Sequence, residues 1–277
     1  MTRDPDHALA LLRRLDFDTY LSCLYLPQVV RRDIATLWAF DAEIDRVPML
    51  VSEAMPGEIR LQWWRDRLMW SEKDHETSPL ADALLNVIER NSLPVETFHA
   101  YLDARIFDLY NDPMPDTGSL EGYLGETVAV HFMNAALCFG AERSTLLADA
   151  CGHAGMAVGI GRILMRLALD RHKRRIYVPK ETLSSRLLSS EGWLDGEIDD
   201  QHLLVVEDLC QLGQYHYTVA QSQIGELPAV LKPLFLPLSQ VPLRLKAVRK
   251  ADSDAFSKPL VISPLKRYWA LFYSATF

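Results

Sequence analysis

Apolar residues recur at helical spacing along almost the whole chain, and the strict alternation that is typical of strands is absent. The spacing predicts helices over residues 7–15, 31–47, 58–72, 79–91, 94–110, 119–139, 144–170 and 199–224. Pro79 and Pro94 suit first helical turns, and Ser119 and Ser144 are predicted N-caps. Residues 176–179 are predicted to form a short extended segment.

The pattern changes in the last part of the chain. Pro228, Pro233, Pro237 and Pro242 interrupt residues 227–243, so helices there must be short or kinked. A loop is predicted at 256–264 and a final turn of helix at 265–274. No repeat, low-complexity run or linker divides the 277 residues. We therefore predict one all-α domain over residues 1–277, with about ten helices whose apolar stripes pack together.

Composition narrows the class of protein. The formal net charge is −8, which argues against nucleic acid as a partner because nucleic-acid binders normally carry a basic face. Cys23, Cys138, Cys151 and Cys210 form no CxxC pair, which fits free thiols in a reducing compartment and disfavours zinc. No apolar run reaches the roughly 18 residues of a membrane span, and the N-terminus lacks signal-peptide features. These features predict a cytoplasmic protein and leave peripheral contact with a membrane open.

Residues 155–181, GMAVGIGRILMRLALDRHKRRIYVPKE, resemble the second signature of the squalene/phytoene synthase family without a gap. The frame of that signature is kept at Gly155, Ala157, Ile163, Leu164, Arg175, Tyr177, Pro179 and Glu181. Residues 26–45, LPQVVRRDIATLWAFDAEID, are similar to the first signature of the family. The resemblance implies an all-α, isoprenoid-synthase-type helical bundle around a central cavity.

Both signatures depart from the family at the residues that hold magnesium. In the second, Arg162 and Arg166 stand among the positions of the family's polar ligands, and Asp170 is the one aspartate left. In the first, the family's leading aspartate falls on Asp45, while Asp41 and Asp45 form a DxxxD spacing shifted by one turn. The family's reaction needs carboxylates to bridge Mg²⁺ to a substrate diphosphate.

The resemblance thus implies a degenerate pocket without an intact catalytic residue and without a cofactor. The residues that form this predicted pocket are Asp41, Asp45, Arg162, Arg166, Asp170, Arg175 and Tyr177. If the pocket held magnesium at all, the available ligands would be Asp41, Asp45 and Asp170.

Arg162 and Arg166 lie one turn apart and are predicted to project into the cavity. A buried guanidinium group without a partner is costly, so each must be paired. One interpretation is an internal ion pair with Asp41, Asp45 or Asp170. The other is a bound anion, because arginine binds phosphate through two parallel hydrogen bonds without a metal. We favour the internal ion pair.

These departures resemble a degenerate branch of the family that includes the mitochondrial complex I assembly factor and its bacterial relatives. That branch implies a non-catalytic binding or assembly module for the respiratory NADH dehydrogenase, with complex I subunits or the inner-membrane surface as partners. One alternative is a head-to-head transferase on farnesyl or geranylgeranyl diphosphate with a rearranged magnesium site. A further alternative is a metal-free binder of a prenyl or lipid phosphate.

Overall fold

The computed structural model describes residues 7–69 and 78–276, and all regular structure in these two ranges is helical. In chain order the segments are α1 (His7–Leu15), α2 (Phe17–Leu24), α3 (Gln28–Asp45), α4 (Val47–Leu50), α5 (Ala54–Met69), α6 (Pro79–Arg90), α7 (Val95–Ala104), η1 (Arg105–Leu109), α8 (Thr117–Leu124), η2 (Gly125–Ala129), α9 (Val130–Cys138), α10 (Thr145–Met165), α11 (Leu167–His172), α12 (Lys180–Ser185), α13 (Ser190–Asp195), α14 (Asp200–Glu226), η3 (Lys232–Gln240), α15 (Val241–Ala251), η4 (Asp252–Phe256) and α16 (Pro264–Thr276). The predicted all-α class is confirmed.

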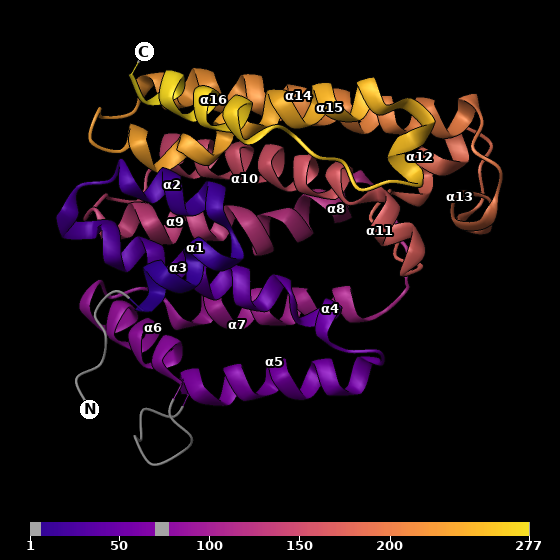
Figure 1. Cartoon of the computed structure of the whole chain (residues 1–277). Coiled ribbons are helices and arrows are strands. Elements are labelled where there is room, and N and C mark those ends of the chain that lie inside the picture. Colours follow the sequence, from indigo (N-terminus) through magenta and orange to yellow (C-terminus); the bar gives the residue numbers. More distant parts are fainter. Residues whose placement is uncertain (1–6, 70–77, 277) are drawn as a thin grey trace.

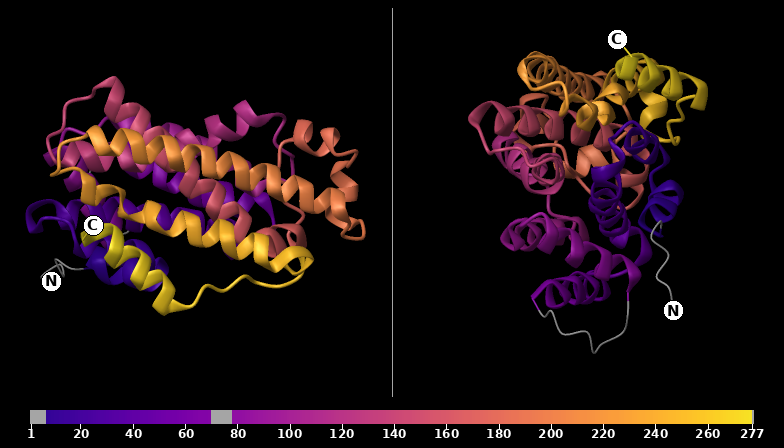
Figure 2. Two further views of the ribbon diagram at one scale, coloured as in Figure 1. Left: turned by 90° about the horizontal axis from the view of Figure 1, so that it is seen from above. Right: turned by 90° about the vertical axis from the view of Figure 1, so that its left-hand side faces the viewer.

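The helices lie in stacked layers, and the N-terminal helices α1, α2 and α3 belong to the middle of the stack (Figure 1). Helices α5, α6 and α7 form one outer layer, and α14, α15 and α16 form the opposite one, with α3, α9 and α10 between them. Residues 257–263 then run along the molecule to α16, which lies at the edge of its layer (Figure 2). None of the helices in the described ranges has the length and apolar character that crossing a lipid bilayer requires.

Helix α10 is the central helix, because almost every turn of it is apolar and buried. Ser144 caps its start by accepting a hydrogen bond from the backbone N–H of Leu147 at 3.2 Å. The helix packs along α14 and crosses η2. At that crossing, Gly155 lies so close to Ala129 that a Cβ atom at position 155 would overlap with the backbone of Ala129. The first glycine of the family-like signature therefore permits close helix packing.

Several helix boundaries differ from the predictions. The predicted cap at Ser119 is wrong: Asp116 is the N-cap and accepts from the backbone N–H of Ser119 at 2.7 Å. The predicted helix at 119–139 consists of α8, the π-helical turn η2 and α9. The helix predicted at 94–110 changes to 3-10 geometry at Arg105, and the one predicted at 144–170 is interrupted at Arg166. Apolar periodicity continues across these changes, so it does not mark them.

Other segments were missed or are only partly described. Helix α2, which begins at an Asp16 cap, was not predicted, and neither was α15. Residues 176–179 lie outside any helix, and Pro179 has the extended backbone expected there; the carbonyl of Ile176 accepts from the backbone N–H of Met114 at 3.4 Å. Residues 70–72 of the helix predicted at 58–72 lie outside the described residues. The assignment of residues 1–277 to a single domain stays a prediction.

Candidate functional site

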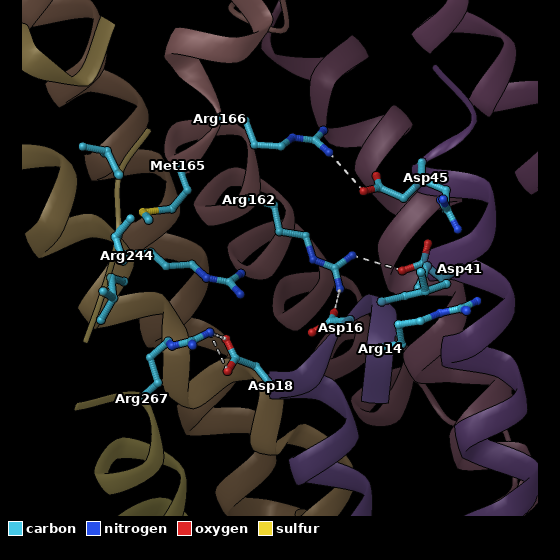
Figure 3. Close-up of a pocket in the computed structure, with 16 residues that line it drawn as sticks. Arg14, Asp16, Asp18, Asp41, Asp45, Arg162, Met165, Arg166, Arg244 and Arg267 are labelled. Carbon is cyan, nitrogen blue, oxygen red and sulfur yellow. Dashed lines mark hydrogen bonds and ion pairs between the residues drawn. The ribbon is translucent and has the colours of Figure 1, made fainter. Parts of the chain in front are cut away.

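A cavity of about 610 Å³ lies between α3, α10, α15 and the segment that leads to α16 (Figure 3). Six arginines and four aspartates line it, together with a smaller apolar set. The full lining consists of Arg14, Leu15, Asp16, Asp18, Asp41, Ala42, Asp45, Arg46, Arg162, Met165, Arg166, Arg244, Leu260, Val261, Ile262 and Arg267. Four of the predicted pocket residues therefore meet at one cavity: Asp41 and Asp45 on α3, and Arg162 and Arg166 at the end of α10, where Arg166 is the capping residue.

Asp41 is buried on the inner face of α3, and both of its carboxylate oxygens are engaged. Oδ1 accepts from Nη2 of Arg105 at 2.9 Å and from the hydroxyl of Tyr101 at 3.0 Å, and Nε2 of His131 lies 3.4 Å away. Oδ2 accepts from Nη1 of Arg162 at 3.0 Å. The carboxylate is therefore enclosed by polar side chains from four other elements, α7, η1, α9 and α10.

Asp45 lies one turn further along α3 and is bound in the same way. Its Oδ1 accepts from Nη1 of Arg105 at 3.0 Å, and its Oδ2 accepts from Nη1 of Arg166 at 3.0 Å. Arg162 also contacts Asp16, the N-cap of α2, at 3.3 Å, so the arginines at the end of α10 reach acidic groups on α3 and at the start of α2 (Figure 3). These are the internal ion pairs that we favoured over a bound anion.

Arg105 joins the two aspartates and was not identified from the sequence. Its side chain is only 4% exposed, and it also pairs with Asp108 at 3.0 Å. It is the only lysine or arginine between Arg90 and Arg143. A lone cation in such a long apolar and acidic stretch was an available signal that it is buried in an ion pair.

The ion pairs determine the charge state of the site. Burial by itself would raise the pKa of Asp41, but the interactions with His131, Arg162 and Arg105 outweigh burial and hold this pKa well below its usual value. Burial also opposes ionisation of Asp45, yet Arg166 and Arg105 together lower its pKa. Both groups are therefore ionised at neutral pH.

The remaining predicted pocket residues, Asp170, Arg175 and Tyr177, do not line the cavity. Tyr177 donates to Oδ1 of Asp108 at 2.6 Å, and Arg175 donates to the carbonyl of Pro48 at 2.8 Å. Asp170 is buried, and its Oδ2 has no hydrogen-bond partner among residues 7–69 and 78–276. Burial raises the pKa of Asp170 to about 6, although Arg166 and Arg175 act in the opposite direction.

Magnesium does not fit this arrangement. It needs hard oxygen ligands, and the four carboxylate oxygens of Asp41 and Asp45 are taken by guanidinium groups. Within residues 7–69 and 78–276, no group of three or more His, Cys, Asp or Glu residues is arranged to hold a metal ion. The four cysteines are buried free thiols. The absence of a cofactor stays a prediction.

The fold and cavity define a helical bundle of isoprenoid-synthase type. A solved dehydrosqualene synthase in complex with a ligand superimposes with a TM-score of 0.79, covering 98% of both chains at 18% identity. The sequence profile of the squalene/phytoene synthase family matches residues 12–266, and the chain belongs to this family. The predicted fold and family are both confirmed.

The relatives of this chain include both an assembly factor and an enzyme. The chain is 27% identical over 270 residues to a Rattus norvegicus protein named NADH dehydrogenase (ubiquinone) complex I, assembly factor 6; the match covers 95% of this chain and 80% of that protein. It is 21% identical over 268 residues to phytoene synthase of Arthrospira platensis, covering 91% of this chain and 86% of that enzyme.

Proposed function

We propose that this protein is a non-catalytic member of its family that acts as an assembly factor for the respiratory NADH dehydrogenase. One observation carries the non-catalytic part: Arg105, Arg162 and Arg166 bind all four carboxylate oxygens of Asp41 and Asp45. Similarity to complex I assembly factor 6 over 95% of the chain supports the assembly part.

The ion pairs occupy the carboxylates that would hold the metal ion, and an allylic diphosphate needs that metal ion in order to ionise. In metal-assisted chemistry of this kind, the cation offsets the negative charge that develops on the leaving group. Here the carboxylates that would hold such a cation are neutralised by the protein itself. An arginine can bind a phosphate, but the arginines of α10 are already paired with aspartates.

The alternative is a head-to-head prenyl transferase with magnesium on Asp41, Asp45 and Asp170. It requires three arginines to leave their partners at once, which would leave buried charges uncompensated. Protein incubated with Mg²⁺ and farnesyl or geranylgeranyl diphosphate should therefore release no pyrophosphate. Release at an enzyme-like rate that Asp170→Asn abolishes would establish the transferase instead.

Helix α16 presents exposed side chains that suit contact with the inner face of a membrane. Leu265, Trp269 and Tyr273 recur at a spacing of four residues, and their side chains are 64%, 61% and 65% exposed. Exposed Lys266 lies beside them. Aromatic side chains next to basic ones suit the boundary between water and anionic lipid. We infer that α16 rests on an anionic lipid surface while the protein acts on its partner subunits.

The assembly role is tested by deleting the gene in the organism that encodes it. Membranes of the deletion strain should contain less NADH dehydrogenase, while succinate dehydrogenase, as a matched control, stays unchanged. Hopanoid or carotenoid levels should also stay unchanged. Complementation with Asp170→Asn should restore the complex as well as wild type does. Loss of isoprenoid products with normal NADH dehydrogenase would reject the proposal.

A further inference from the structure

Two histidines meet where α14 packs along α10, and a glutamate of α8 completes the cluster. Nδ1 of His153 on α10 lies 2.9 Å from Nδ1 of His216 on α14, and Nε2 of His216 lies 3.1 Å from Oε1 of Glu121. The side chain of His216 is only 3% exposed, whereas that of Glu121 is 35% exposed. His153 is half-buried. One chain of polar contacts therefore joins three helices.

The two imidazole rings make the contact between α10 and α14 at this point. The nearest buried residues of α14 on either side of His216 are Gly213 and Ala220, which offer little or no side chain. A Cβ atom at position 213 would lie 3.1 Å from Cγ2 of Ile160 on α10, so the two helices approach closely one turn before His216. The rings of His153 and His216 have their centroids 5.0 Å apart. A change in the pair therefore acts directly on the packing of the two helices.

The hydrogen bonds determine where the protons of the neutral pair lie. The carboxylate of Glu121 can only accept, so Nε2 of His216 carries a proton and donates it. A neutral imidazole has one N–H, which leaves Nδ1 of His216 as an acceptor. Nδ1 of His153 must then carry a proton and donate to Nδ1 of His216. With both rings neutral, one arrangement of protons satisfies both contacts.

The pair can take up one further proton but not two. With one added proton, a single hydrogen still lies between the two facing nitrogens, so their hydrogen bond is kept. A second added proton places an N–H on both nitrogens at 2.9 Å, and the two positive rings repel each other. Burial lowers the pKa of His216, Glu121 acts in the opposite direction, and His153 adds to the lowering.

Other charged groups on the elements that pack against α14 lie too far along the helix to offset this repulsion. Within the described part of the chain, those of α12, α15 and η3 contact α14 more than two turns from His216. Their contacts with α14 are Arg186 with Asp208, Arg249 with Glu207, and Lys232 with the carbonyl of Gly225. Asp149, one turn before His153 on α10, is exposed to solvent, which screens its charge.

We propose that His153, His216 and Glu121 form a proton-sensitive clasp that holds α8 and α14 against α10 and opens when both histidines are positively charged. Because the pKa of His216 is lowered in the folded protein, the contribution of the clasp to stability is present in full above the pKa of an unfolded histidine. This contribution is lost as the pH falls through the pKa of the folded protein. Helix α14 shares an outer layer with α15 and α16 (Figure 1), so acid loosens the layer that carries α16.

The first test observes the histidine rings of the wild-type protein. Nitrogen-15 chemical shifts report which ring nitrogen carries a proton. At a pH where both rings are neutral, Nδ1 of His153 and Nε2 of His216 should be protonated. On acidification, the pair should take up its two protons in separate steps, because the rings are coupled. Protons on other nitrogens, or uptake of both protons in one step, would overturn the proposal.

The second test compares hydrogen exchange of the α14 amides around residue 216 at pH 7 and pH 5. His216→Gln keeps an N–H for Glu121 and an oxygen acceptor for His153 but cannot become charged. Acidification should therefore open α14 about tenfold more in wild type than in His216→Gln, the factor that one pKa unit represents. His172→Gln is the matched control, because His172 is exposed on α11; it should behave like wild type.

Equal pH dependence of exchange in wild type and His216→Gln would show that the pair is an ordinary packing contact and reject the clasp. The ring measurement needs no variant, so it decides the proposal even if His216→Gln does not fold. The clasp is independent of the proposed assembly role, so either can fail without the other.

Discussion

Arg105 lies on η1, and its guanidinium group reaches Asp41 and Asp45 on α3, as well as Asp108 on η1 itself. The centre of this guanidinium group also lies 5.3 Å from the ring of Tyr101. Each α3 aspartate is shared between Arg105 on its inner side and an α10 arginine on the cavity side. The stability of the inner wall therefore depends on a residue that does not face the cavity.

Replacement of Arg105 should be strongly destabilising. Arg105→Gln leaves the buried carboxylates of Asp41 and Asp108, and the half-buried one of Asp45, with one cation fewer each. Loss of one partner of a buried pair costs about 3–5 kcal/mol. The free energy of unfolding in urea measures this cost. Arg174→Gln is the control, because its pair with Asp195 is exposed on both sides; it should cause no measurable change. Equal effects of the two substitutions would contradict this account of the site.

Replacement of Asp170 should stabilise the protein, and the size of this gain should depend on pH. Burial raises its pKa from 3.8 to about 6 in the folded protein, which makes the ionised native state about 3 kcal/mol less stable. The protonated carboxyl of Asp170 favours folding at pH values below the pKa of Asp170 in the unfolded chain, and this contribution to stability is lost as the pH rises through 6. Asp170→Asn should therefore raise stability by up to about 3 kcal/mol at pH 8.

At pH 4 the Asp170→Asn variant and wild type should have nearly the same stability, because Asp170 is then largely protonated in the native protein. Thermal unfolding at both pH values measures the difference. A variant less stable than wild type at pH 8 would show that ionised Asp170 has a compensating partner.

At the scale of the helices, the close contact of α10 with η2 fixes the position of the arginines on α10. Gly155 lies at this crossing, two turns before Arg162, and a Cβ atom there would meet backbone rather than a movable side chain. Gly155→Ala should destabilise the fold by about 1–3 kcal/mol, as overpacking does. Gly152→Ala is on the same helix, and apart from the local backbone of α10, no described residue has a heavy atom within 4 Å of its Cβ position.

The control at position 152 should leave stability unchanged or raise it by up to about 1 kcal/mol, because alanine favours helix more than glycine does. Urea unfolding of both variants measures the contrast. If both substitutions stabilised the protein, the proposed tight crossing of α10 and η2 would be incorrect.

The sequence predicts features that depend on local interactions and misses those that depend on contacts between residues far apart in the chain. Long helices such as α10 were predicted because periodicity and the Ser144 cap are local signals. The pairing of Arg162 and Arg166 with α3 followed from the family frame. Arg105 and Arg244 were missed: Arg105 lies 64 residues from Asp41, and neither belongs to a signature. Whether a lone arginine is buried depends on packing between distant helices, which no local pattern specifies.

At the scale of the whole molecule, charge is divided unevenly along the chain. The net charge is −8, yet residues 227–277 contain eight lysines and arginines and only two aspartates. This basic part includes α15 and α16, which share one outer layer (Figure 1). An anionic surface should therefore attract this side of the molecule and repel the rest, which would orient the protein before any specific contact forms.

Co-sedimentation with lipid vesicles tests this orientation. The protein should bind vesicles that contain phosphatidylglycerol, bind pure phosphatidylcholine weakly, and dissociate as salt screens the charges. Trp269→Ser removes an exposed aromatic residue of α16 and should weaken binding by about tenfold or more, given the apolar area lost. Tyr215→Ser, at an exposed aromatic of α14 that is 58% accessible, should bind like wild type. Binding that is insensitive to salt and equal in both variants would mean that α16 does not face the lipid.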